Sequence, residues 1–466
     1  MKAKITAALS LVIMILLLVV FSSCGVKEAQ REYIPLPSVT EAQFLDTLQY
    51  YSFLYFVNEI NEETGLVKDR SADWSPSSIA ATGFGVAAWI VGAERGWIPR
   101  EQAVRYVSNL VRFLLASDHR GDTNSTGYKG FYYHFLKMND GRREWKSELS
   151  SIDTGLLLAG LITAYEYFDR KTDEEKYIRE SVIAIKERIE WDWMLMQKDY
   201  TQYPDHVGSL SMGWTPESGF HNMGWIGYNE AMILYVMAAG GDFKNAESAY
   251  KIWLSTYKWQ EPYKGLQHFV FPPLFGHHYS HMFLDTKGLY DARTSEMNID
   301  YFENTRRATL TQRLYCIENP HKWEGYDSLT WGITACDGPG ETYNRDGRKY
   351  LGYAGRGTSG PEYNYFDDGT IAPTAAGGSV PYAPEICVPA LYNMFTKYGP
   401  QGLWSKYGLK DAFNLTAGWI GPDYIGIDQG PIVIQIENYK SGLIWKYFMK
   451  NKYVRDGLKR LGFVKR

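Results

Sequence analysis

The chain has 466 residues, a formal net charge of −4 and 15% aromatic residues, among them 36 Tyr and 15 Trp. Its 49 basic side chains do not exceed its 53 acidic ones, which argues against nucleic acid or an anionic lipid surface as a partner. Tyr and Trp combine an apolar body with a polar end, so this composition favours a wet carbohydrate-binding cleft over a merely tyrosine-rich core.

The first residues are typical of an export signal. A lysine-containing start precedes an apolar run over residues 5–21, and small residues lead directly to Cys24. This order resembles a bacterial lipobox, although Phe21 stands where leucine is more usual. A transmembrane anchor is the alternative, but about 17 apolar residues are short for a membrane span. We predict a signal peptide over 1–23, a lipidated Cys24, a tether over 24–38, and an exported lipoprotein in the periplasm or at the cell surface.

Helical periodicity dominates the rest of the chain. Apolar residues recur every three or four positions, and many of these runs start at capping residues. We predict helices over 40–60, 79–95, 99–117, 152–168, 172–190, 229–239, 242–257, 299–318, 383–398, 431–450 and 452–461. The helix over 79–95 is full of Ala and Gly, and these small residues should let it lie close to its neighbours. Strand patterns are sparse, and we predict short strands only over 201–203 and 269–271.

The connections between these helices suggest the architecture. Short turns alternate with long loops rich in glycine, aromatic and acidic residues, and there is no repeat of the solenoid kind. Helical hairpins with elaborated loops on one side favour an all-α toroid, an (α/α)6 barrel, over an irregular α-solenoid. We predict one such domain over residues 39–466, with its long loops around a single cleft.

One stretch, residues 213–230, collects groups suited to a sugar. It contains Trp214, Glu217, His221, Trp225, Tyr228 and Glu230. Aromatic planes can stack on sugar rings, and an isolated carboxyl group can protonate a glycosidic oxygen. Glu230, at a predicted helix start, could be desolvated enough to act as the acid, or could only complement the helix dipole. Glu217 is the rival acid, or else a loop residue that binds backbone amides.

Glycoside hydrolysis needs a second carboxyl group as base or nucleophile. Asp428 lies directly before the predicted helix 431–450 and is the best candidate. Glu437, inside that helix, could face the barrel axis or be a buried, hydrogen-bonded glutamate. Asp153, at another helix start, could cap its helix or bind sugar hydroxyls.

Other motifs are weaker. The glycine pattern over 355–360 is followed by Pro361 and opens no helix, so we dismiss it as a dinucleotide site. His277, His278 and His281 do not form HExxH, and sugar binding or a structural role is favoured over zinc. The remaining cysteines, at 316, 336 and 387, are far apart and should pack as small apolar residues. We predict no metal and no cofactor.

Five segments spread over most of the chain carry a further signal. They read SIAATGFG at 78–85, GYNEA at 227–231, DYFENTRRAT at 300–309, YGL with DAFN within 407–414, and IDQGP with IENY within 427–439. Together they resemble a bacterial glucoamylase-like family that is similar to glycoside hydrolase family 144, the endo-β-1,2-glucanases. The resemblance implies an (α/α)6 barrel and cleavage of linear β-1,2-glucan to sophoro-oligosaccharides without a metal.

The resemblance also assigns roles. The family's acid is expected in GYNE, which gives Glu230, and the second carboxylate in IDQGP, which gives Asp428. Glu217, with the rings of Trp214, Trp225 and Tyr228, then becomes the expected substrate platform. Inversion of the anomeric centre is expected on the same ground.

Several alternatives remain open. An exo-acting, sophorose-releasing enzyme and a hydrolase of another glucan, including starch, fit the same motifs. A non-catalytic surface glycan-binding lipoprotein would show the same aromatic residues. In each case we expect a monomer that binds an oligo- or polysaccharide, has no nucleic-acid partner and touches the membrane only through its lipid anchor.

Overall fold

The computed structural model describes residues 36–341 and 347–466, and Leu36–Arg466 forms one compact unit. The predicted signal peptide, Cys24 and nearly all of the predicted tether lie outside the described residues. Within the described ranges, no helix is both long enough and apolar enough to cross a membrane.

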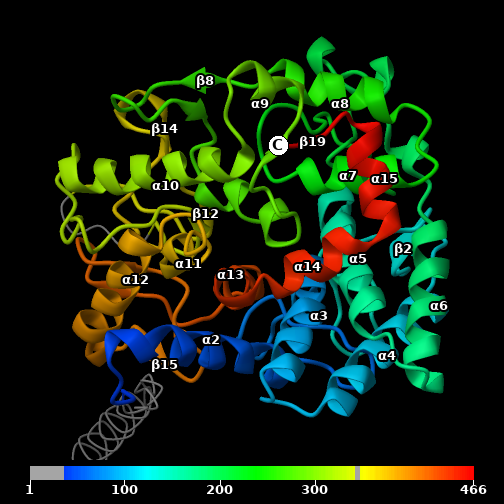
Figure 1. Ribbon diagram of the computed structural model, residues 1–466, viewed down its shortest axis with the longest axis horizontal. Helices are drawn as coiled ribbons and strands as arrows, with labels where there is room; N and C mark the ends of the chain where they lie inside the picture. The colour runs from blue at the N-terminus through cyan, green and yellow to red at the C-terminus, as the bar shows by residue number, and fades with distance from the viewer. Residues whose placement is uncertain (1–35, 342–346) are drawn as a thin grey trace, which may run out of the picture. The chain divides into compact units, whose positions relative to one another are not determined.

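Helices form most of the regular structure (Figure 1). They are α2 (Glu41–Asn58), α3 (Ile79–Glu94), α4 (Arg100–Ala116), α5 (Ser151–Tyr167), α6 (Asp173–Glu187), α7 (Met232–Gly240), α8 (Ala246–Ser255), α9 (Ala292–Glu296), α10 (Tyr301–Glu318), α11 (Pro373–Gly377), α12 (Pro384–Asn393), α13 (Gly426–Ser441), α14 (Leu443–Lys450) and α15 (Lys452–Arg460).

The strands are two or three residues long and belong to the loops. They are β1 (Ser77–Ser78), β2 (Gly127–Tyr128), β3 (Phe131–Tyr132), β4 (Phe135–Leu136), β5 (Leu149–Ser150), β6 (Gly213–Thr215), β7 (Gly219–Phe220), β8 (Trp259–Gln260), β9 (His268–Phe269), β10 (Leu289–Tyr290), β11 (Ala335–Cys336), β12 (Ala354–Gly355), β13 (Gly357–Thr358), β14 (Asn364–Phe366), β15 (Trp404–Ser405), β16 (Gly408–Leu409), β17 (Phe413–Asn414), β18 (Trp419–Ile420) and β19 (Val464–Lys465). Their antiparallel ladders are β1–β4, β2–β3, β5–β6–β7, β8–β9, β10–β19, β11–β12, β13–β14, β15–β16 and β17–β18.

The helices form an inner and an outer layer. The inner helices α3, α5, α7 and α13 are buried on nearly all sides, whereas α4 and α6 have one buried and one charged face. Figure 1 shows α13 nearly end-on at the centre, with α4 and α6 at the periphery. The late helix α13 packs against the early helices α2 and α3, so the ring closes on itself. The fold is therefore the predicted (α/α)6 barrel and not an open solenoid.

Small residues allow the inner helices to approach closely, as the sequence predicted for the helix at 79–95. A Cβ atom added at Gly160 of α5 would lie 2.3 Å from the backbone oxygen of Gly83 on α3. A Cβ atom at Gly83 would meet the backbone oxygen of Leu156 at 2.6 Å. Because backbone atoms cannot yield as a flexible side chain can, both positions require glycine.

Some predicted elements differ from the observed ones. Residues 201–203 form no strand, and the strand predicted over 269–271 is β9, which ends at Phe269. The helix predicted over 431–450 is two helices, separated at Gly442, whose φ of 66° is left-handed. The first of them begins five residues earlier than predicted, because Pro431, taken as a helix start, lies inside it.

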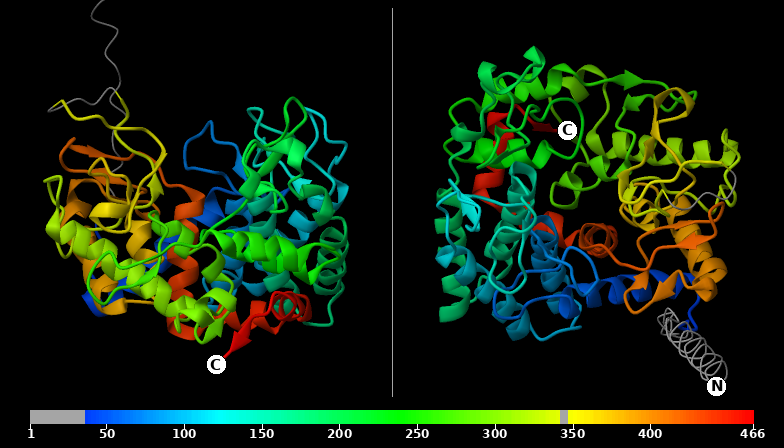
Figure 2. Two further views of the ribbon diagram at one scale, coloured as in Figure 1. Left: turned by 90° about the horizontal axis from the view of Figure 1, so that it is seen from above. Right: turned by 180° about the vertical axis from the view of Figure 1, so that it is seen from behind.

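The long connections gather at one end of the barrel. Figure 2 (left) shows them on the side opposite the C-terminus. Their short ladders give these loops backbone hydrogen bonds without a large sheet. The loop end is therefore where a site built from many segments can form.

Candidate active site

A cavity of about 130 Å³ is bounded by residues from several of these loops and helix starts. Its polar lining residues are Glu230, Asp153, His134, Tyr279 and Tyr353. Ala80, Ile152, Leu156, Phe275, Ala335 and Ile427 complete the lining. Two of the residues predicted for the site, Glu230 and Asp153, thus share one cavity.

Glu230 lies in the turn directly before α7. Its main chain is held firmly, since Ser280 Oγ donates to its carbonyl oxygen at 2.5 Å and the adjacent Asn229 Oδ1 accepts from the Ala231 amide at 2.9 Å. Its carboxyl oxygen Oε2 is buried and has no hydrogen-bond partner within the described residues. Burial raises the pKa of Glu230 to about 7, and the negative charge of Asp153 adds to the rise. A carboxyl group in this state still holds its proton in about half of the molecules at neutral pH and can act as a general acid.

Asp428 forms a carboxyl pair with Asp411. Asp428 is 1% exposed and lies in the first turn of α13, where the sequence had placed it in a loop. Burial and the charge of Asp411 raise the pKa of Asp428 well above its ordinary value. Burial and the charge of Asp337 raise the pKa of Asp411. Two carboxyl groups that share a site resist ionising together, so the pair can hold one proton between them and accept another at its second carboxyl group. We call Asp411 and Asp428 the aspartate pair.

A network around Arg70 supports the aspartate pair. Arg70 Nη1 donates to Asp337 Oδ2 at 2.9 Å, and its Nε donates to Asp69 Oδ2 at 3.4 Å. The Asp337 amide in turn donates to Asp411 Oδ2 at 2.8 Å. One guanidinium therefore serves several carboxylates, and the region keeps a strong negative field.

The sequence analysis named neither Asp411 nor Asp337 as a site residue. Asp411 belongs to the DAFN segment of the family resemblance, which was the one signal that could have found it. No regular spacing links these residues to Asp428, because they come from separate loops.

Tyr279 connects the two acidic groups. After burial, the charges of Asp428, Glu230 and Asp153 each raise the pKa of its hydroxyl. Burial and the charges of Asp428 and Asp411 likewise raise the pKa of the Tyr353 hydroxyl, and Tyr353 lines the same cavity. Glu230 and the aspartate pair therefore act on one common region.

His134 supplies a positive charge beside Asp153. Its Nδ1 lies 3.0 Å from Glu148 Oε1, and its Nε2 lies 3.7 Å from Asp153 Oδ1. Burial alone would lower the pKa of His134, but the carboxylates of Asp153 and Glu148 raise it to about 9. Ser150, not Asp153, caps α5, and its Oγ also bonds the Asp153 carboxylate. Asp153 thus lies at the cavity with both Ser150 and His134 beside its carboxyl group.

The predicted aromatic platform is corrected by the structure. Trp225 is 8% exposed, and its indole Nε1 donates to Ser151 Oγ at 2.9 Å. Tyr228 is 4% exposed and stacks on Tyr301 with ring centroids 5.9 Å apart. Trp214 is half-buried in a cluster of rings. Indole and phenol rings in a glycine-rich loop can pack inward when neighbouring helices cover them, and Trp225 and Tyr228 do so here.

Three further predicted residues do not line the cavity. Glu217 binds Arg143 through two bonds of 2.7 and 3.0 Å, and Glu437 binds Arg95 through two bonds of 2.7 and 3.1 Å. His221 is half-buried and is not a lining residue of this cavity. Glu217 and Glu437 therefore have charge partners that Glu230 lacks.

The weaker motifs have structural roles. His277, His278 and His281 are buried, and each ring bonds a neighbouring backbone or hydroxyl oxygen. Within residues 36–341 and 347–466, no group of three His, Cys, Asp or Glu side chains has the arrangement of a metal site. Cys316, Cys336 and Cys387 are free and buried, as predicted.

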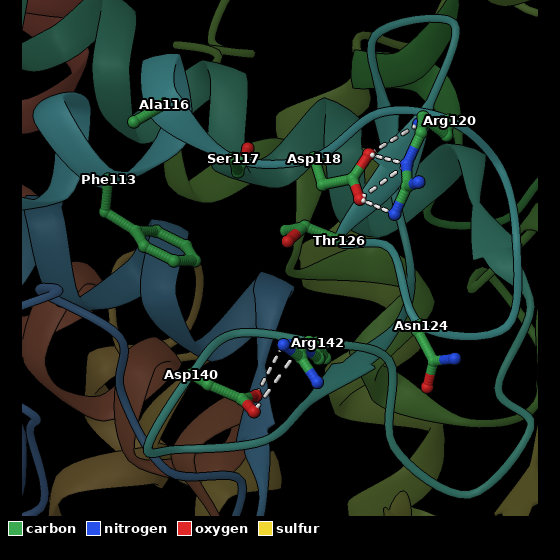
Figure 3. Close-up of a pocket in the computed structure, with 9 residues that line it drawn as sticks. All are labelled: Phe113, Ala116, Ser117, Asp118, Arg120, Asn124, Thr126, Asp140 and Arg142. Atoms are coloured by element: carbon green, nitrogen blue, oxygen red, sulfur yellow. Dashed lines mark hydrogen bonds and ion pairs between the residues drawn. The ribbon is translucent and has the colours of Figure 1, made fainter.

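A larger cavity of about 530 Å³ has a different character (Figure 3). Its charged residues form two local ion pairs, Asp118 with Arg120 and Asp140 with Arg142. Both pairs are open to solvent, where water screens an ion pair and its contribution is small. Size alone therefore does not identify the site, and the smaller cavity at Glu230 is the better candidate.

Comparisons with known proteins identify relatives of this chain. The family model "Putative glucoamylase" matches residues 222–452. The exo β-1,2-glucooligosaccharide sophorohydrolase (non-reducing end) of Parabacteroides distasonis is 30% identical over 92% of this chain, and the chain spans 59% of that relative's length.

Solved structures show the same fold. The crystal structure of a "putative glucoamylase" from Bacteroides uniformis is 35% identical to this chain. Its TM-score is 0.79 over 92% of this chain and 99% of that one. The endo-β-1,2-glucanase of Chitinophaga pinensis, solved in complex with sophorotriose and glucose, is 28% identical. Its TM-score is 0.76 over 92% of this chain and 99% of that one.

Proposed function

Because the chain belongs to the glucoamylase-like family, we propose that it is a glycoside hydrolase that cleaves β-1,2-glucan to sophoro-oligosaccharides. The observation that carries the proposal is the state of Glu230, a carboxyl group with a buried, unpartnered oxygen and a pKa raised to about 7 within the described cavity. The activities named for the Parabacteroides and Chitinophaga relatives support the choice of linkage.

The chemistry needs an acid and a base. Protonated Glu230 donates its proton to the glycosidic oxygen as the bond from the anomeric carbon to that oxygen breaks. Water adds to the anomeric carbon, and its proton passes to the carboxylate of the aspartate pair. The leaving sugar keeps the glycosidic oxygen, which becomes a hydroxyl group with the proton from Glu230. The anomeric carbon keeps the oxygen of the water as the hydroxyl group of the new reducing end. An inverting outcome is proposed on family resemblance, and proton NMR of the first-formed anomer tests it.

The other residues of the cavity hold the substrate. Asp153 can accept hydrogen bonds from sugar hydroxyls, and the half-exposed Tyr353 can present its ring and hydroxyl to the same sugar. His134, whose pKa is raised to about 9, supplies a positive charge beside Asp153, whereas Glu230, whose pKa is raised to about 7, carries the exchangeable proton.

Reducing-end release from a panel of glucans tests the proposal. The wild-type protein should cleave β-1,2-glucan and leave laminarin and starch largely intact. Cleavage of starch without cleavage of β-1,2-glucan would overturn the linkage. Retention of β-1,2-glucan on an affinity gel without new reducing ends would instead indicate a glycan-binding protein. The product series separates an exo-acting enzyme, which releases sophorose alone, from an endo-acting one.

The N-terminal residues support a proposal on location. The small residues before Cys24 favour export and lipidation at that cysteine. Labelling with a fatty acid should be lost in Cys24→Ala, and equal labelling of both proteins would rule the anchor out.

A further inference from the structure

Two exposed tryptophans lie together near the cavity without lining it. Trp74 is 65% exposed and Trp145 is 52% exposed. Their ring centroids are 6.2 Å apart, and their planes are tilted by 48°. Trp74 belongs to the loop before β1, and Trp145 belongs to the loop between β4 and β5. Large apolar rings from two loops that meet in solvent point to a binding role.

The backbone at Trp145 is unusual in a way that presents its ring. Trp145 has a φ of 58° and Lys146 a φ of 79°. Residues other than glycine are uncommon in this left-handed region, and two in succession are maintained only when the surrounding structure imposes them. Because the Trp145 ring stays exposed, burial of that ring does not explain the conformation.

Ring contacts join Trp145 to the Glu230 cavity. Trp145 packs edge-on against Phe135 with centroids 5.1 Å apart. Phe135 stacks on His134 with centroids 3.9 Å apart and planes 13° apart. His134 lines the cavity beside Asp153 and Glu230. Trp145 is thus connected through Phe135 and His134 to the cavity that contains Glu230.

Trp74 is joined to the aspartate pair from the other side. The Arg70 guanidinium carbon lies 5.7 Å from the centroid of the Trp74 ring. Arg70 binds Asp337, whose amide binds Asp411. Trp145 is therefore linked to the Glu230 cavity, and Trp74 is linked through Arg70 to the aspartate pair.

We propose that Trp74 and Trp145 form an outer subsite that stacks a glucose unit of the same β-1,2-glucan chain, beyond the units held at the cavity. The inference rests on the proposed function and deepens it. Rings 6.2 Å apart are too close to admit a sugar between them, since two van der Waals contacts need roughly 7–8 Å. The sugar therefore lies on the outer face of the two rings.

The surroundings of the rings favour a sugar over a protein or a lipid. Exposed Asp73 and Lys146 are the sequence neighbours of the two tryptophans, and Arg70 lies beneath one of them. A pyranose ring has an apolar face and polar edges, which match isolated aromatic planes bordered by charged groups. A lipid or a protein core would require a broader apolar patch.

The test uses a ladder of β-1,2-linked glucose oligomers, from the shortest one cleaved up to the polymer. In Trp74→Ala and Trp145→Ala, kcat/KM for long oligomers should fall about three- to tenfold, the scale of one aromatic contact. kcat/KM for the shortest cleaved oligomer should stay unchanged. Trp74→Phe should retain most of the long-chain activity because it keeps an aromatic plane.

Tyr439→Ala is the matched control, because Tyr439 is 46% exposed and lies on α13 roughly 16 Å along the helix from Asp428. It should change no rate. An equal loss at every oligomer length, or no loss at any length, would overturn the subsite while leaving the hydrolase intact. If the wild type cleaves no glucan, the proposed function fails first. Affinity electrophoresis of Glu230→Gln, with and without Trp74→Ala, then decides the subsite, and equal retention on β-1,2-glucan would reject it.

Discussion

Glu230 and Glu437 are two glutamates with buried carboxyl oxygens, and the sequence analysis named both as candidate site residues. Glu437 is 1% exposed, and its carboxylate accepts bonds from Arg95, from Gln49 at 3.0 Å and from Ser441 at 2.6 Å. Glu230 Oε2 has no such partner within the described residues, and burial raises its pKa to about 7. Burial alone therefore does not mark a catalytic acid; burial without a charge partner does.

The difference has an energetic consequence. A buried carboxylate with an arginine and two further donors contributes to a single folded structure, and loss of the arginine is costly. A buried carboxyl group without partners costs stability and is retained where it serves a function. Substitution of Glu230 should therefore lower the activity and leave the stability intact. Loss of the Glu437 ion pair should lower the stability and leave the activity per folded molecule nearly unchanged.

The largest effect is expected for Glu230→Gln. The amide keeps the shape but cannot donate a proton to the leaving oxygen, so kcat on β-1,2-glucan should fall about 10²–10⁴-fold. The thermal midpoint should not fall. A loss below tenfold would show that Glu230 is not the general acid, and its contrast with Glu437 would then have no catalytic meaning.

Arg95→Leu tests the other side of the comparison. Glu437 would keep Gln49 and Ser441 but lose its charge partner, and the free energy of unfolding near pH 7 should fall by about 3 kcal/mol. The loss should shrink at acidic pH, because the uncompensated carboxyl acquires a raised pKa and becomes protonated. Activity per folded molecule should change little, and denaturant unfolding at two pH values measures the effect. Glu437→Gln is the control. It has no carboxyl group to titrate at this position, so its loss of unfolding free energy should depend less on pH.

The pH dependence of stability measures Glu230 directly. Its folded pKa of about 7 lies above the ordinary 4.5, so the folded state binds more protons than the unfolded state between these values. The Glu230 contribution is therefore fully present below about pH 4.5 and is lost as the pH rises through 7, at a cost of about 3 kcal/mol. Glu230→Gln removes this contribution. The wild type minus variant difference in unfolding free energy should fall over that window, and a flat difference would contradict the raised pKa.

The sequence was informative where the signal is local. Periodicity placed the helices, and small residues predicted the close packing seen at Gly83 and Gly160. The GYNE motif located Glu230, whose neighbours in the chain hold its main chain in place. The fold class followed from the alternation of short turns and long loops, which is also a property of neighbouring residues.

Tertiary contacts decided the rest. Whether an aromatic ring in a loop is exposed depends on which helices cover it, so Trp225 was mistaken for a platform residue while Trp74 was passed over. Likewise, the partner of Asp428 comes from another loop, and no spacing along the chain links Asp411 to it. The charge state of a carboxyl group is fixed by such partners and cannot be derived from its motif.

The smallest effect is expected for Asp411→Asn, which extends the comparison to the aspartate pair. The charge of Asp411 helps to raise the pKa of Asp428, so its removal should lower that pKa. The acidic limb of the kcat/KM profile should move to lower pH, with a loss of no more than about tenfold at neutral pH, because Asp428 then accepts the proton alone. An unmoved acidic limb would mean that the two carboxyl groups titrate independently. The alkaline limb reports Glu230 and should stay near pH 7 in both proteins.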